Sequence, residues 1–152
     1  MPIILQPIEF ANLLTKEKLS VLGIDYGSKN LGLAIASSPT YVTTPLDILR
    51  RKTLKKDFQA LQELQKEVSF QTVLIGLPLN MDGSEGPMAQ ATKQFGFYLK
   101  DYCGWPVCFW DERLSSVEAL ERTQPKKHDR IDHFAAHIIL ESYLQRHLSN
   151  NQ

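Results

Sequence analysis

Three acidic residues occupy positions at which a mixed α/β fold would bring them together. Asp25 follows the apolar residues 21–24, Glu112 closely follows the apolar residues 107–110, and Asp132 falls in the first turn of a C-terminal helical pattern. A charge at the rim of a core loses hydration unless a partner compensates it. Three converging carboxylates would repel one another unless a cation lay among them. These acids therefore predict a site for a divalent cation.

The chemistry expected of such a site is hydrolysis of a phosphodiester bond. Mg²⁺ is a hard ion that binds oxygen ligands and commonly shares its coordination shell with substrate phosphate, and Mn²⁺ is a natural substitute. One or two such ions, about 4 Å apart, orient a water molecule and stabilise the leaving oxygen. The acids alone favour a metal-dependent phosphodiesterase, and they leave RNA and DNA open as substrates.

The first half of the chain predicts the strands that carry Asp25. Apolar runs separated by a short polar turn are typical of an antiparallel hairpin. A third, weaker strand contains Pro45, which favours an edge position. Apolar residues then recur at helical spacing from Thr53 onward. The predicted elements are strands over 19–25 and 31–37 with a turn over 26–30, a strand over 41–49, and a helix over 53–68.

The second half predicts the elements that deliver the other two acids. A continuous apolar run is typical of a buried strand that pairs in parallel. Gly104 and Pro106 mark the end of a helix. The predicted elements are a strand over 72–77, a loop over 79–86, a helix over 88–102, a strand over 107–110, a helix from Ser115 or Ser116 to Glu121, a polar and basic segment over 124–130, and a last helix from 131.

The expected architecture is one α/β domain with the element order βββαβαβα and a five-stranded mixed sheet. Strands one to three are antiparallel, and strands four and five run parallel to strand one. The carboxyl ends of strands one and five then meet at one edge, where open α/β sheets bind ligands. Ala135 and Ala136 allow the last helix to approach the sheet closely, which brings Asp132 toward the same edge.

The composition limits the number of domains and the kind of partner. The chain has 152 residues, of which 43% are hydrophobic, and this is enough for one sizeable core. Its 17 basic and 17 acidic side chains cancel, so a nucleic acid must be bound by a local basic patch. We expect an N-terminal extension without an assigned role over 1–18, a single domain over 19–148, and a frayed tail over 149–152.

The cysteines and the N-terminus predict a cytoplasmic protein. Cys103 and Cys108 have no metal-ligand spacing and are expected to be free thiols, as in a reducing compartment. Pro7 and Glu9 interrupt the partly apolar N-terminus, which therefore lacks the layout of a signal peptide. No apolar run approaches the roughly 20 residues of a membrane-spanning helix.

Five sequence blocks carry a family resemblance. They read Gly23-Ile24-Asp25-Tyr26-Gly27, Leu31-Gly32-Leu33-Ala34, Gly76-Leu77-Pro78-Leu79-Asn80-Met81-Asp82-Gly83, Asp111-Glu112-Arg113-Leu114-Ser115, and Ile131-Asp132 followed by Ala135-Ala136 and Ile138-Ile139-Leu140. In this order, between residues 20 and 147, they resemble the signature blocks of the YqgF (RuvX-like) family, a bacterial group with the ribonuclease H-like fold. The third block is far more specific than the first.

The resemblance implies a nuclease. The family is described as processing the 5′ end of the small-subunit ribosomal RNA precursor (pre-16S rRNA) and as resolving Holliday junctions. It implies that Asp25, Glu112 and Asp132 are catalytic residues that bind Mg²⁺ or Mn²⁺. The expected partner is structured RNA or branched DNA, without a membrane, and the protein is expected to be a monomer or a homodimer.

Substrate contacts are expected from basic and polar residues around these acids. Family members often carry a longer segment, rich in glycine and lysine, before the last helix, whereas residues 122–130 are short here and contain no glycine. The segment nevertheless keeps its positive charge. Its binding of substrate is expected to differ from that of family members with the longer segment. The candidate nucleic-acid-binding residues are Lys29, Asn80, Arg113, Lys126, Lys127 and Arg130.

Each acid also has a structural alternative. Asp25 could simply stabilise a turn. Asp132 would occupy the third helical position after an Asp129 N-cap, where an acid favours the helix dipole, and Asp129 is the substitute ligand. Strand alternation allows only one of Asp111 and Glu112 to face the site, and the family resemblance selects Glu112.

Two further patterns favour structural explanations. His133 and His137 have the spacing of a zinc-binding pair, but without a third ligand they are expected to be surface residues. The basic run Arg50, Arg51, Lys52, Lys55 and Lys56 is typical of a solvated helix start, and contact with phosphate is the minority interpretation. The loop over 79–86 either contacts substrate or only turns the chain.

The leading hypothesis is a metal-dependent endonuclease that acts on structured RNA, and the alternative is a resolvase of four-way DNA junctions. A resolvase would favour a dimer that cuts two strands symmetrically. Actin-like ATPases and sugar kinases share the opening Gly-Ile-Asp-x-Gly pattern, but they need a second equivalent domain for which this chain has no room. A catalytically silent nucleic-acid-binding module would bind RNA without regard to divalent ions.

Overall fold

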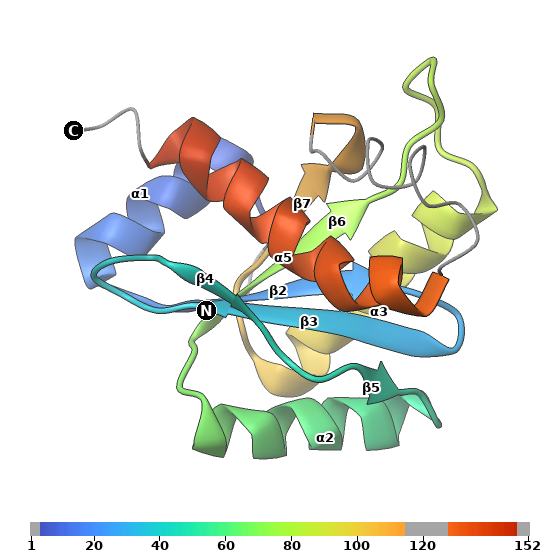
Figure 1. The fold of residues 1–152 in the computed structure, drawn as a ribbon, viewed down its shortest axis with the longest axis horizontal. Coiled ribbons are helices and arrows are strands. Elements are labelled where there is room, and N and C mark those ends of the chain that lie inside the picture. Colours follow the sequence, from blue (N-terminus) through green and yellow to red (C-terminus); the bar gives the residue numbers. More distant parts are fainter. Residues whose placement is uncertain (1–3, 115–127, 149–152) are drawn as a thin grey trace.

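A computed structural model describes residues 4–114 and 128–148, with the side chains of 128–133 excepted. Its centre is a mixed sheet in the order β1-β7-β6-β2-β3-β4, with β5 also paired to β3 (Figure 1). The strands are β1 (Ile4–Leu5), β2 (Val21–Tyr26), β3 (Asn30–Ala36), β4 (Thr43–Pro45), β5 (Leu49–Arg50), β6 (Thr72–Leu77) and β7 (Val107–Asp111). The described helices are α1 (Pro7–Glu17), α2 (Leu54–Glu67), α3 (Pro87–Cys103) and α5 (His128–His147), with a short 3₁₀ turn, η1 (Glu112–Leu114).

The strand directions agree with the predicted α/β sheet. β2 and β3 form an antiparallel hairpin in which Asp25 pairs with Gly32. β6 runs parallel to β2, and β7 runs parallel to β6 with Leu77 opposite Asp111. The carboxyl ends of β2, β6 and β7 therefore lie at one edge of the sheet, as the sequence predicted.

The predicted helix boundaries follow from local capping. Thr53 precedes α2, and its side-chain oxygen accepts a hydrogen bond of 3.2 Å from the backbone N–H of Lys56. Such a side chain satisfies one of the free N–H groups of the first turn. α3 ends at Gly104, which adopts a φ of 78° in the left-handed region that favours glycine.

Two regions add to the predicted sheet. The predicted third strand forms two short strands, β4 and β5, because Pro45 has no N–H with which to continue the ladder on β3. The segment without an assigned role contains β1, which pairs in parallel with β7, and α1, which begins with Pro7 at its first position. Residues 115–127 and 149–152, and with them the predicted helix to Glu121 and the predicted tail, lie outside the described residues.

Two hydrophobic clusters cover the two faces of the sheet. On one face, α1 and α5 pack through Phe10, Leu14, Leu140 and Tyr143. On the other face, α2 and α3 pack a cluster rich in aromatic residues, which includes Phe58, Phe70, Phe95 and Trp105. In the part of the chain that the structure describes, no helix has the length and apolarity needed to cross a membrane.

Candidate active site

Asp25 lies on the face of β2 that α5 covers. A Cβ atom on Gly23 would lie 3.0 Å from Leu140 Cβ and 3.4 Å from the Ala136 carbonyl oxygen, so α5 packs directly on this glycine. Strand alternation places Asp25, two residues later, on the same face. Ile24 belongs to the cluster on the opposite face. Asp25 is therefore a partly buried acid at the end of β2, beside α5.

Glu112 extends over the neighbouring strand on this same face. A Cβ atom on Gly76 of β6 would lie 2.7 Å from Glu112 Oε1 and 2.6 Å from Ile139 Cδ1. The missing side chain of Gly76 thus provides the space in which the Glu112 carboxylate lies, under α5. Because β6 is the strand between β2 and β7, the structure brings Asp25 and Glu112 to the same edge and the same face.

Asp111 and Arg113 flank Glu112 and form an ion pair with each other. The Arg113 guanidinium donates to Asp111 Oδ2 at 2.8 Å, and the Arg113 backbone N–H donates to Asp111 Oδ1 at 2.9 Å. The hydrogen bond from Arg113 lowers the pKa of Asp111 below its ordinary value. The Asp111 carboxylate is therefore held by hydrogen bonds from Arg113 in the same turn. The carboxylate of Glu112, which lies between them in sequence, is placed over Gly76.

The loop over 79–86 is fixed by internal hydrogen bonds and by Arg113. Asp82 Oδ1 accepts from the Ser84 hydroxyl at 2.6 Å, and this bond lowers the pKa of Asp82. The Asn80 amide donates to the same hydroxyl at 2.9 Å. Arg113 Nη1 donates to the Met81 carbonyl oxygen at 3.2 Å, while the Met81 side chain is 85% exposed. The loop stands as a fixed, exposed projection beside Glu112.

The third predicted acid lies in α5. Asp132 is one helical turn before Ala136, the residue whose carbonyl oxygen meets Gly23, and the first turns of α5 lie on the same side of the molecule as the β2–β3 turn (Figure 1). Its side chain, like those of Asp129, Arg130 and His133, is outside the described residues, and so are Lys126 and Lys127. Among the side chains that are described, no group of three His, Cys, Asp or Glu residues could hold a metal ion.

The β2–β3 turn contains the predicted substrate contact Lys29, and the partly buried Arg51 fixes this turn. Arg51 Nη1 donates to the Gly27 carbonyl oxygen at 3.1 Å, and the Arg51 backbone N–H donates to the Lys29 carbonyl oxygen at 2.8 Å. Arg51 Nε donates to Asp57 at 3.1 Å, and its guanidinium lies 4.7 Å from the centre of the Tyr26 ring. Arg51 thus joins the turn after Asp25 to the start of α2.

The sequence interpretation missed Gly76 and the role of Arg51. The signal for Arg51 is Asp57, which precedes Phe58 on the apolar face of α2 and is buried to 2% exposure, so it needs a buried cation. His137, expected at the surface, is half-buried. Cys103 and Cys108 are free thiols as predicted, and burial raises the pKa of each to about 12.

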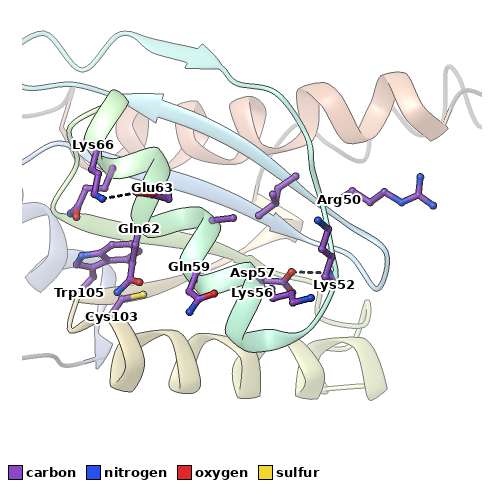
Figure 2. A pocket seen from close by; sticks show the side chains of 13 residues that line it. Arg50, Lys52, Lys56, Asp57, Gln59, Gln62, Glu63, Lys66, Cys103 and Trp105 are labelled. Atoms are coloured by element: carbon purple, nitrogen blue, oxygen red, sulfur yellow. Dashed lines mark hydrogen bonds and ion pairs between the residues drawn. The ribbon is translucent and has the colours of Figure 1, made fainter.

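A groove of about 1130 Å³ lies along α2, on the face of the sheet opposite α5 (Figure 2). Most of the residues that line it have polar or charged side chains, with Arg50, Lys52 and Lys56 at one end and Lys66, Cys103 and Trp105 toward the other. Neither Asp25 nor Glu112 contributes to it. The concave surface and the carboxylates are thus separate features.

The arrangement of the sheet and its helices defines a fold class, the ribonuclease H-like fold. A solved structure of RuvC from T. thermophilus in complex with Holliday junction substrate superimposes with a TM-score of 0.52 and 13% sequence identity, covering 84% of this chain and 96% of that one. At this identity the likeness shows the fold.

Sequence relatives define the family. The sequence profile of the RuvX family, described as Holliday junction resolvase, matches residues 19–146. A protein of Caldanaerobacter subterraneus subsp. tengcongensis is 38% identical over 133 residues, covering 83% of this chain and 96% of its own. A protein of Syntrophomonas wolfei is 39% identical over 132 residues, covering 83% and 94%. Both are named "Putative pre-16S rRNA nuclease". The chain belongs to the RuvX family, and the resemblance found in its sequence is confirmed.

Proposed function

We propose that this protein is a metal-dependent endonuclease that hydrolyses phosphodiester bonds in the 5′ leader of pre-16S rRNA. The observation that carries the proposal is the Glu112 carboxylate, which lies over Gly76 on the sheet face and edge occupied by Asp25. Two carboxylates at one glycine-lined edge beneath α5 supply the oxygen ligands that a divalent cation binds.

Asp25, Glu112 and Asp132 are the proposed metal-binding residues. Their carboxylate oxygens are the donors that Mg²⁺ and Mn²⁺ prefer, so the residues fit the ion. When bound, the ion supplies charge stabilisation at the phosphate and lowers the pKa of a water molecule. Gly76 keeps the Glu112 carboxylate beside β6, and the turn formed by Asp111 and Arg113 fixes the backbone on either side of it.

The proposed nucleic-acid contacts surround this edge. Lys29 is exposed in the β2–β3 turn, and Asn80 belongs to the exposed loop that Arg113 anchors. The Arg113 side chain is itself 37% exposed, and its exposed part is a proposed contact. The basic segment before α5 is the remaining proposed contact, through Lys126, Lys127 and Arg130. Location in the cytoplasm and the choice between monomer and homodimer stay predictions from the sequence.

Cleavage of a pre-16S rRNA 5′ leader tests the proposal. Asp25→Asn and Glu112→Gln should each lower the rate in Mn²⁺ by roughly 100-fold or more, since even residues that only orient metal ligands cost 10- to 100-fold. Asp101→Asn, an exposed acid at the end of α3, is the matched control and should leave the rate unchanged. Calorimetry should show weaker Mn²⁺ binding in the first two variants alone. Undiminished cleavage by Asp25→Asn would overturn the assignment.

The second candidate function is resolution of four-way DNA junctions, which the description of the RuvX profile favours. The same variants are therefore assayed on a mobile four-way junction. Faster cleavage of the junction than of the RNA, together with a dimer in solution, would select the resolvase. RNA binding that is tight, independent of divalent ions and without cleavage would select a catalytically silent module.

A further inference from the structure

The basic run before and within the first turn of α2 is divided by the fold into one buried cation and four exposed ones. Arg51 is 13% exposed and is held by Asp57 and by the Gly27 carbonyl oxygen. Arg50, Lys52, Lys55 and Lys56 are exposed. We name these four residues the α2 basic patch. Only Arg51 has a structural role in the interior, so the patch needs a separate explanation.

The charges of the patch are not balanced by nearby acids. Within residues 4–114 and 134–148, no carboxylate lies within ion-pair distance of its four side chains. Asp57, the acid nearest in sequence, binds Arg51 and the backbone N–H of Lys52. At the other end of α2, by contrast, Lys66 pairs with Glu63 at 2.8 Å, and Figure 2 shows this pair well away from Lys52 and Lys56. Uncompensated cations are therefore concentrated at the start of the helix.

Helix stability does not account for the two lysines. Lys55 and Lys56 occupy the first turn of α2, where the helix dipole favours acids and disfavours cations. Asp57 is the acid of that turn, but Arg51 neutralises it. A solvated helix start would therefore be more stable with neutral or acidic residues at 55 and 56. Their positive charge is unfavourable for folding, which points to an external partner.

The patch adjoins the turn that follows Asp25. Asn30 pairs with Arg50 between β3 and β5, and the Arg51 N–H donates to the Lys29 carbonyl oxygen. Figure 1 shows β5, the start of α2 and the β2–β3 turn on one side of the molecule. Lys29 and the patch thus lie on neighbouring segments, between the end of the strand that carries Asp25 and the groove along α2.

We propose that the α2 basic patch binds the phosphodiester backbone of the RNA substrate at a distance from the cleaved bond. The inference rests on the proposed function and extends it to residues of a different element. A chain with no net charge cannot attract a polyanion through its overall field, so local unbalanced cations must do so. Contacts of this kind contribute affinity without sequence selectivity, through release of counterions.

Binding measured without cleavage tests the patch. The probe is the pre-16S rRNA 5′ leader in EDTA, titrated at several salt concentrations. The double variant Lys55→Gln/Lys56→Gln should bind about 5- to 10-fold more weakly at low salt, and its slope of log affinity against log salt should fall by about 1.4 to 1.8, or 0.7 to 0.9 per lost contact. Its melting temperature should be unchanged or higher, because the dipole penalty is removed.

The charge-matched control is Lys16→Gln/Lys66→Gln. Lys16 lies in the last turn of α1 and Lys66 is paired with Glu63 at the far end of α2. This variant should keep the affinity and the salt slope of the unmodified protein. Equal weakening of both double variants, or of neither, would overturn the role of the patch.

Cleavage separates this inference from the proposed function. In Mn²⁺, Lys55→Gln/Lys56→Gln should raise KM and leave kcat unchanged, because Asp25 and Glu112 are intact. If the unmodified protein binds and cleaves the RNA while the salt slopes of the variants agree, the patch inference alone fails. If the unmodified protein neither binds nor cleaves the RNA, the proposed function fails and the inference falls with it.

Discussion

The two faces of the sheet differ in the arrangement of their charged side chains. On the face of α2 and α3, the buried Asp57 is fully matched by Arg51, and aromatic rings close around the pair. On the face of α5, small residues such as Gly23 and Gly76 make room for a helix and for the Glu112 carboxylate. One face has a completed ion pair, and the other brings two acids to a common edge. The matched pair is a structural element, whereas the two acids at the common edge are the residues that we propose to bind a metal ion.

The largest expected effect on stability comes from the face that contains the pair of Asp57 and Arg51. Asp57→Ala would leave Arg51 buried without its carboxylate and would lower the free energy of unfolding by about 3–5 kcal/mol. Urea denaturation measures this loss. The double variant Arg51→Met/Asp57→Leu removes both charges and should be destabilised less than Asp57→Ala. Unchanged stability of the Asp57→Ala variant would show that the pair is not a structural element.

A pair of glycine substitutions, with an intermediate expected effect, compares the two faces directly. Gly76→Ala places a Cβ atom against Glu112 Oε1 and Ile139 Cδ1, whose flexible ends must move. We expect a loss of about 1–3 kcal/mol, as for other overpacked sites, together with at least 10-fold slower RNA cleavage because Glu112 is displaced. Denaturation and cleavage assays measure the two effects.

The matched control for Gly76→Ala is Gly96→Ala on the opposite face. A Cβ atom there would collide with the Phe109 ring, so stability should fall by a similar amount or more. The cleavage rate at a temperature where the variant is folded should nevertheless stay close to that of the unmodified protein. Equal losses of activity in the two variants would mean that Gly76 acts through stability alone.

The smallest expected effect concerns the exposed pair beside Glu112. Arg113 lowers the pKa of Asp111, so the pair stabilises the fold above the ordinary pKa of aspartate, and this contribution is lost as pH falls through the lowered value. Asp111→Asn should lower the melting temperature at pH 7 by no more than about 2 °C, because exposed pairs contribute little. The difference should begin to shrink below about pH 4, the ordinary pKa of aspartate, and should be lost as the pH falls through the lowered pKa of Asp111. A constant difference down to pH 2.5 would contradict this origin.

Local patterns were sufficient to predict most of the central elements. Alternating apolar residues predicted β2 and β3, and Thr53 and Gly104 predicted the limits of α2 and α3, because caps and periodicity depend on neighbours in sequence. The N-terminal strand was not predicted, since it consists of Ile4–Leu5 alone and pairs with a strand about a hundred residues later. A two-residue strand has no detectable period.

The candidate site was predictable in its acids and not in its surroundings. Strand ends and the family resemblance selected Asp25 and Glu112, whose roles stay predictions. Gly76 was quoted only as part of a sequence block, because its role depends on Glu112, which crosses to it from another strand. Arg51 looked like its basic neighbours, since only tertiary packing distinguishes the arginine that turns inward.

The pairing of β1 with β7 has a consequence for assembly. β7 would otherwise be an edge strand with unpaired N–H and C=O groups, which are a template for pairing with another chain. β1 occupies these groups, and the hydroxyl of Tyr143 in α5 donates to the Pro7 carbonyl oxygen at the start of α1. A second copy cannot pair with Val107 and Cys108 while this short segment is in place. Pairing of another chain with these two residues would require the N-terminal segment to leave them, as in an exchange of N-terminal segments between two molecules.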